Sequence, residues 1–320
     1  MPYPRELSAC QVIVAVRDDL TGGKSGEILH AHAAFDDFLF NNSRTMTHLI
    51  ENRLNRRDWL RLGAGALLSL GLWPGRLRGA DNGKGDTFRF VVINDAHFHS
   101  PKCPGWFERV SASVRSHQPR AELCLMVGDL AEHGAGSELG AMRDVLLSLQ
   151  MPFHVVIGNH DYASNSDRSA WDKLFPKSLN YRFEHQGWQF IGLDSTQGTS
   201  FEKTLVQPPT LQWLDDHLGS LDKAAPTVVF THFPLGENVP MRPLNADAII
   251  ARFKEFNLVA VFDGHHHGFT ERKVGRTTLT TNKCCAISVN NHDGTKEKGY
   301  FLCTAKDGAI EREFIEVKPA

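Results

Sequence analysis

Five apolar segments of the chain each end in a short cluster of aspartate, asparagine or histidine. The segments are FRFVVIND, AELCLMVGDL, MPFHVVIGNHD, APTVVFTHFP and FNLVAVFDGHHHG. A continuous apolar run of this kind is typical of a strand that is buried on both faces. Helical spacing of apolar residues appears between them, in SELGAMRDVLLSLQ and in TLQWLDDHLGSL, where Thr210 is a candidate N-cap. Strands that alternate with helices predict an α/β fold, and the tail after residue 275 favours further strands without a helix.

The polar clusters follow strands, and ligands of α/β folds bind beyond the carboxyl ends of strands. In chain order the candidates are Asp95, His97, Asp129, Asn159, His160, Asp161, His232, His265 and His267. Carboxylate, amide and imidazole groups without cysteine suit Mn, Fe or Zn better than a thiolate zinc site or an all-oxygen calcium site. Seven ligands with one bridging carboxylate make two four-ligand shells, whereas a single catalytic zinc needs three protein ligands. Glycines before Asp129, Asn159 and His265 would let the chain turn sharply.

Composition excludes some classes of function. The net charge is −2, so the chain lacks the basic excess of a general nucleic-acid binder. Sixteen histidines are many for 320 residues, and histidine is the commonest metal ligand. The six cysteines contain no CxxC, which argues against a zinc ribbon or a thioredoxin motif and favours free thiols.

The segment 46–80 resembles a twin-arginine export signal. Arg56 and Arg57 precede a short apolar run, Leu62 to Trp73, which is too short to span a bilayer. Asn55 replaces the usual serine or threonine, while Trp59 supplies the usual aromatic residue. The resemblance implies a protein exported to the periplasm or beyond, without a transmembrane segment in its mature form. The alternative interpretation of this segment is an amphipathic surface helix with basic residues.

Residues 1–45 precede this signal, so we interpret them as a non-native or disordered extension, with Met46 as an alternative start. They contain TGGKSG, which is similar to a phosphate-binding loop. That motif requires glycine where the chain has Asp18, so we interpret the stretch as a polar turn.

The order D-x-H, GD, GNHD, H and GHxH resembles that of the calcineurin-like metallophosphoesterases. The resemblance extends from Asp95 to His267, and the stretch from GDLAEHG to GNHD looks most like the class III cyclic nucleotide phosphodiesterases. It implies a four-layer α/β/β/α sandwich of two mixed sheets flanked by helices, here over residues 86–318. Glu132 stands where purple acid phosphatases have tyrosine, which argues against a tyrosinate-ligated ferric site.

The family pattern also implies a role for each candidate. Two divalent or trivalent ions are expected, and Asp129 is expected to bridge them. The first ion takes Asp95, His97, Asp129 and His267, and the second takes Asp129, Asn159, His232 and His265. His160 is implied as the general acid and Asp161 as the partner that orients it, whereas His266 matches no ligand position and is expected to face solvent or the cleft.

The function that follows is hydrolysis of a phosphodiester by a metal-bridging hydroxide, with a small-molecule or nucleotide-like phosphoester as substrate. Two alternatives stay open: a phosphomonoesterase with the same site, and a non-catalytic metal-binding interaction protein.

Overall fold

The computed structural model describes residues 87–319 of the chain. The predicted extension, 1–45, and the predicted export signal, 46–80, lie outside these residues and stay predictions, as do the exact boundaries of the 86–318 domain. Among the helices that the structure describes, none combines the length and the apolar character that a membrane crossing requires.

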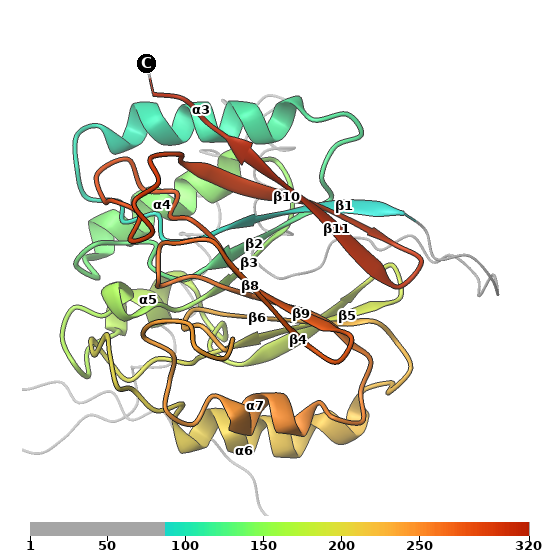
Figure 1. Cartoon of the computed structure of the whole chain (residues 1–320). Helices are drawn as coiled ribbons and strands as arrows, with labels where there is room; N and C mark the ends of the chain where they lie inside the picture. Colours follow the sequence, from blue (N-terminus) through green and yellow to red (C-terminus); the bar gives the residue numbers. More distant parts are fainter. Residues whose placement is uncertain (1–86, 320) are drawn as a thin grey trace, which may run out of the picture. The chain divides into compact units, whose positions relative to one another are not determined.

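The first of two mixed sheets has five strands (Figure 1). They are β1 (Phe88–Ile93), β2 (Leu123–Val127), β3 (Phe153–Val156), β10 (Gly299–Lys306) and β11 (Ala309–Glu316). Their order in the sheet is β11-β10-β1-β2-β3. Strands β1, β2 and β3 are parallel, whereas β10 pairs antiparallel with both β1 and β11. The carboxyl ends of the three parallel strands therefore lie at one end of the sheet.

The second sheet has six strands. They are β4 (Tyr181–His185), β5 (Trp188–Leu193), β6 (Thr227–Thr231), β7 (Leu258–Asp263), β8 (Thr270–Val274) and β9 (Thr277–Thr281). Their order is β4-β5-β6-β7-β9-β8, with parallel pairing from β5 to β9 and antiparallel pairing at both edges. The predicted strands of the tail are present, but the stretch KCCAISVN after β9 forms a loop rather than a strand.

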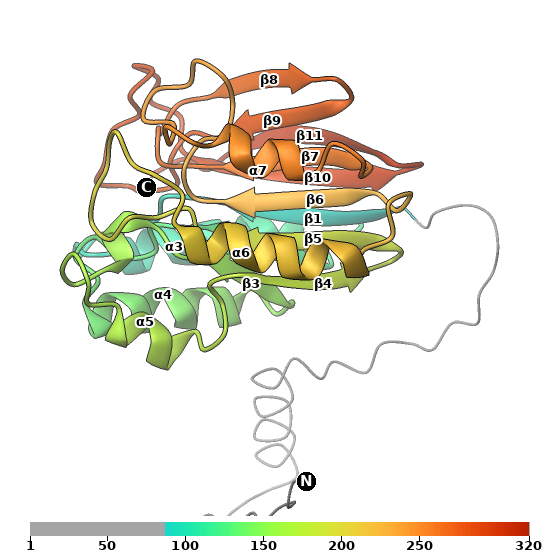
Figure 2. The same ribbon diagram turned by 90° about the horizontal axis from the view of Figure 1, so that it is seen from below.

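Helices cover the outer face of each sheet, as Figures 1 and 2 show. The helices are α3 (Cys103–Ser116), α4 (Gly136–Ser148), α5 (Ser169–Leu174), α6 (Pro208–His217) and α7 (Asp247–Arg252), with short 3₁₀ turns η1 (Asn159–Asp161) and η2 (Leu218–Ser220). The predicted α/β/β/α sandwich is confirmed. The predicted N-cap of α6 is wrong: Gln207 occupies that position, and Thr210 lies in the first turn, where its hydroxyl donates to the Asp194 carbonyl.

Alternation along β1 explains why its sequence is apolar throughout. Val91 and Ile93 pack under α3 and α4, whereas Phe90 and Val92 face the second sheet. The ring of Phe90 lies 5.9 Å from that of Phe262 on β7, edge to face, so aromatic side chains fill the space between the sheets. A strand that is buried on both faces needs apolar residues at both alternating positions.

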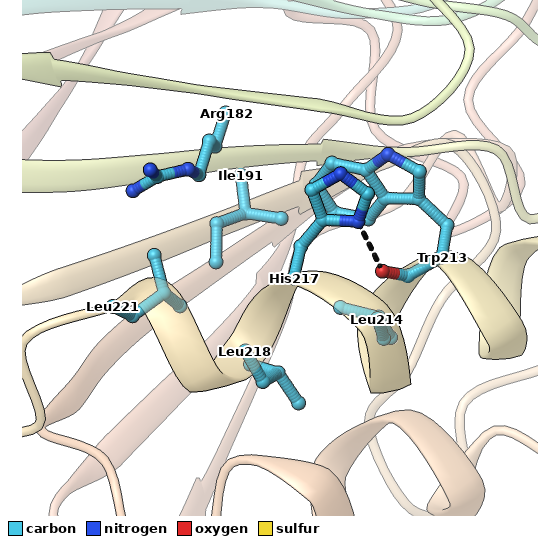
Figure 3. Close-up of a pocket in the computed structure, with 7 residues that line it drawn as sticks. All are labelled: Arg182, Ile191, Trp213, Leu214, His217, Leu218 and Leu221. Atoms are coloured by element: carbon cyan, nitrogen blue, oxygen red, sulfur yellow. Dashed lines mark hydrogen bonds between the residues drawn. The ribbon is translucent and has the colours of Figure 1, made fainter. Parts of the chain in front are cut away.

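Helix α6 packs on the second sheet over a small hollow, shown in Figure 3. Its lining is mostly apolar: Arg182, Ile191, Trp213, Leu214, His217, Leu218 and Leu221. Nδ1 of His217 donates to the Trp213 carbonyl over 2.8 Å, which satisfies one carbonyl of the last turn of the helix. None of the predicted site residues lines this hollow, so it belongs to the packing of the fold.

Candidate metal centre

The structure brings all seven predicted ligands together at the carboxyl ends of five strands. Asp95 and His97 follow β1, Asp129 follows β2, Asn159 follows β3, His232 follows β6, and His265 and His267 follow β7. All seven are buried, with at most 5% of their surface exposed. The carboxyl ends of the parallel strands of both sheets thus meet at one place, where α/β folds bind their ligands.

The first group of ligand atoms comes from both sheets. One ligand atom from each of four residues lies within 4.8 Å of the others: Asp95, His97, Asp129 and His267. Nε2 of His97 lies 3.1 Å from Nε2 of His267, and Nε2 of His267 lies 3.3 Å from Oδ1 of Asp95. Two imidazole nitrogens and two carboxylates that face one another in a buried space form the donor set of a divalent cation.

The second group shares Asp129 with the first. It contains Asp129, His232 and His265 within the same 4.8 Å limit. Nε2 of His232 lies 3.2 Å from Oδ2 of Asp129 and 3.2 Å from Oδ1 of Asn159. Nδ1 of His232 contacts the Val127 carbonyl at 3.1 Å, and a carbonyl can only accept. In neutral His232 the proton is therefore on Nδ1, and Nε2 presents a lone pair to the group.

Asp129 connects the two groups in the way that a bridging ligand requires. Its Oδ1 accepts the amide of His160 over 2.9 Å. Its Oδ2 is buried without a hydrogen-bond partner and lies 3.2 Å from Nε2 of His232 and 3.6 Å from Nε2 of His97. A buried carboxylate oxygen that faces two imidazoles needs positive charge on both sides, so these residues fit a pair of cations.

The pKa values of the buried groups also indicate that the carboxylates need positive charge beside them. Burial lowers the pKa of His232, but Asp129 and Asp95 outweigh it and raise that pKa to about 9. Burial raises the pKa of Asp95, but His267 and His232 outweigh it and bring that pKa to about 2. The carboxylates therefore stay charged, and without another cation the imidazoles must supply the compensating protons.

Five of the seven candidate ligands have left-handed backbone conformations. The φ angles are 50° at Asp95, 42° at His97, 50° at Asp129, 64° at His265 and 49° at His267. Non-glycine residues adopt this region rarely, although aspartate and histidine do so more often than most. Left-handed positions cluster at sites where the surrounding structure fixes them for function.

The three glycines before ligands have different roles. Gly128 has a φ of 78°, so the predicted sharp turn is confirmed there. At Gly158 and Gly264 the reason is close approach: an added Cβ would lie 2.1 Å from Oδ1 of Asp129 and 2.6 Å from Oδ2 of Asp95, respectively. These two glycines keep space for the carboxylates rather than allow an unusual backbone angle.

Two contacts outside the ligand groups fix imidazole rings, and neither was predicted. Oε2 of Glu132 lies 2.7 Å from Nδ1 of His97, and the Phe201 carbonyl accepts from Nε2 of His265 over 2.7 Å. Each contact holds a proton on one ring nitrogen and leaves the other nitrogen free for a ligand role. The position of Glu132 three residues after Asp129 was a usable signal, whereas nothing in the sequence indicates the Phe201 contact.

His160 borders the first group, and its ring centroid lies 4.8 Å from that of His97. Nδ1 of His160 donates to the Glu132 carbonyl over 2.9 Å, and its side chain is 37% exposed. The expectation that Asp161 orients this ring is wrong. The two carboxylate oxygens of Asp161 accept the amides of Ala131 and Gly158, both over 2.9 Å, because this buried carboxylate joins the loops after β2 and β3.

Two remaining expectations concern His266 and the cysteines. His266 is half-buried and belongs to neither ligand group, and its nearest aromatic neighbour is His292, with ring centroids 6.1 Å apart. Within residues 87–319 all five cysteines are free and buried, which confirms the expected thiols there. Cys10 lies outside the described residues.

Comparison with known proteins gives one family and several relatives. Residues 88–269 match the calcineurin-like phosphoesterase family. The chain is 26% identical to the glycerophosphodiester phosphodiesterase GpdQ of Enterobacter lignolyticus, over 59% of this chain and 74% of the relative. It is 29% identical to a 3′,5′-cyclic-nucleotide phosphodiesterase of Nostoc, over 50% of this chain and 61% of the relative.

Among solved structures, the purple acid phosphatase of yellow lupin superposes with a TM-score of 0.52 at 12% identity, over 72% of this chain and 52% of that one. At this identity the likeness concerns the fold alone. The family match contains the predicted ligands from both sheets, since it runs from the start of β1 to the residue before β8.

Proposed function

This chain belongs to the calcineurin-like phosphoesterase family, and from that premise we propose that it hydrolyses small phosphodiesters at a centre of two metal ions. It is a metal-dependent phosphoester hydrolase. The observation that carries the proposal is the shared carboxylate: Oδ2 of Asp129 is buried without a hydrogen-bond partner between two groups of ligand atoms.

The ligand roles proposed for the residues follow the two groups. Asp95, His97, Asp129 and His267 would hold one ion, and Asp129, Asn159, His232 and His265 the other. Bound ions would lower the pKa of a water molecule and neutralise the charge that develops on the phosphoryl oxygens. The mixture of oxygen and nitrogen donors supports Mn, Fe or Zn.

His160 is the residue we propose to protonate the departing ester oxygen. The Glu132 carbonyl accepts the proton on Nδ1, so the opposite ring nitrogen, Nε2, is free to carry a second proton toward the leaving group. The 37% exposure of the side chain leaves it accessible to a substrate, unlike the buried ligands. A positioned general acid contributes about 10²–10⁴-fold to a rate.

Preference for diesters is supported by the relatives, since both GpdQ and the Nostoc protein are phosphodiesterases. The test compares matched mono- and diesters with the same leaving group, alongside elemental analysis of the purified protein. We expect two metal ions per chain and faster turnover of the diester. Asp129→Asn should lower metal content and turnover together, because it removes the charge that both ions share.

Three results would count against the proposal. Faster turnover of the monoester would favour a phosphomonoesterase. Two metals with no turnover of either ester would favour a binding protein. Retention of both metals and full turnover in Asp129→Asn would remove the proposed bridge.

A further inference from the structure

One exposed aromatic residue is tied through its backbone to a candidate ligand. The side chain of Phe201 is 58% exposed and belongs to none of the hydrophobic clusters of residues 87–319. The carbonyl oxygen of the same residue accepts from Nε2 of His265 over 2.7 Å. This contact holds the backbone of Phe201 beside the candidate metal centre, and the exposed phenyl ring is attached to that backbone.

The loop that carries Phe201 is anchored on both sides of that residue. The hydroxyl of Thr199 donates to Oδ1 of Asn165, in the neighbouring loop after β3. The amide of Leu205 donates to Oε1 of Gln197 over 3.0 Å, which closes the loop on itself. The exposed ring therefore stands on a fixed backbone, a property of residues that recognise ligands.

Apolar surface is concentrated around this loop. Six large apolar side chains are exposed among the described residues, and three of them are Phe201, Leu205 and Leu244, at 58%, 44% and 68%. The amide of Leu244 donates to the Thr204 carbonyl over 2.9 Å, so the two segments that carry these side chains adjoin. Clustering of this kind marks a binding surface more often than single exposed residues do.

His160 and Phe201 contact different ligand groups, which suggests which part of a diester Phe201 would meet. His160 borders the first ligand group through His97, whereas Phe201 contacts the second group through His265. A diester whose leaving oxygen lies at His160 directs its other ester group elsewhere. The loop of Phe201 contacts the second group through its backbone and carries exposed apolar side chains.

We propose that Phe201 is a specificity-determining residue that stacks on a planar aromatic group of the non-leaving ester. The proposal rests on the proposed phosphodiesterase function and narrows its substrate class to diesters with an aryl or nucleobase-bearing substituent. An exposed ring on a fixed loop offers a face for stacking, which tolerates different planar groups because every one of them has a π face.

The test keeps the leaving group constant and varies the other ester. The metal-loaded full chain is assayed on phenyl p-nitrophenyl phosphate and on methyl p-nitrophenyl phosphate. In Phe201→Ala the ratio of kcat/KM for the phenyl ester over the methyl ester should fall about tenfold, a typical loss for one aromatic stack. Metal content should not change, since the carbonyl that contacts His265 is retained. Leu147→Ala, at another exposed apolar residue on α4, should leave the ratio unchanged.

The outcomes separate this inference from the function on which it rests. An unchanged ratio in Phe201→Ala, or an equal loss on both esters, overturns the inference and leaves the phosphodiesterase standing. A Phe201→Leu variant with the wild-type ratio overturns the stacking role, because apolar contact alone would then suffice. A wild-type enzyme that hydrolyses neither diester overturns the proposed function and this inference together.

Discussion

Removal of the Glu132 carboxylate should weaken the binding of one of the two proposed metal ions and leave the binding of the other unchanged. Glu132 contacts Nδ1 of His97 over 2.7 Å, and His97 belongs to the first ligand group but not to the second. The His232 ring, in the second group, is held instead by the Val127 carbonyl. In Glu132→Ala the His97 ring loses its partner, so the first ion should bind less tightly while the second is retained.

The magnitude follows from the contact that is lost. A hydrogen bond to a charged group contributes about 1.5–3 kcal/mol, and the 23% exposure of the Glu132 side chain places the effect toward the lower end. Loss of such a partner typically lowers metal affinity about 10–100-fold. We therefore expect the first ion to bind about tenfold more weakly, with turnover mostly restored at high metal concentration.

The assay is calorimetric titration of the metal-free protein, with stoichiometry and affinity fitted for two sites. Glu132→Gln keeps an acceptor without charge and should fall between wild type and Glu132→Ala. Glu138→Gln is the matched control, because Glu138 accepts the amides of Glu132 and His133 without contacting His97. Equal weakening of both ions, or wild-type affinity in Glu132→Ala, would refute the reasoning.

Three further predictions follow from single sites. His160→Ala should keep both metals and lose about 10²–10⁴-fold in turnover, most on alkoxide leaving groups that need a proton. His232→Ala should instead lose metal, and with it activity on every substrate. Equal losses across leaving groups with metal depletion in His160→Ala would make His160 a ligand or a structural residue. Burial lowers the pKa of His154 to about 3, so the unfolded state gains the proton first as pH falls below about 6.5. The free energy of unfolding of wild type should therefore fall by about 2 kcal/mol more than that of His154→Phe between pH 7 and pH 5. Denaturant unfolding measures this difference, and identical pH profiles would contradict it. Replacement of Arg56 and Arg57 by lysine should leave the protein unprocessed in the cytoplasm, and an unchanged yield outside it, measured by fractionation, would remove the export signal.

The strands and their polar ends could be predicted from the sequence because each signal is local. The run FRFVVI reads as a strand on its own, and Asp95 follows it directly. The parallel order of β1, β2 and β3 then places Asp95, Asp129 and Asn159 at one end without further information. The same logic failed for Asp161, since adjacency to His160 in sequence did not predict which amides its carboxylate would meet.

The contacts that fix the imidazole rings could not be predicted, because they depend on how separate loops meet. The Phe201 carbonyl reaches His265 across 64 positions of the chain. Glu132 reaches His97 across 35 positions. The Phe201 contact leaves no pattern in the local sequence, and Glu132 is marked only by its position three residues after Asp129. Sequence patterns therefore identified the candidate ligands, which the structure brings together, but not the groups that orient them.

The architecture of the site also implies that metal binding and folding stability are coupled. Five candidate ligands have left-handed backbone conformations, and each such position costs of order 1–2 kcal/mol for a non-glycine residue. Asp95 and Asp129 add two carboxylates with at most 1% exposure. A cation that binds only the folded state offsets both costs, since it compensates the buried charge and stabilises the state that holds the strained backbone.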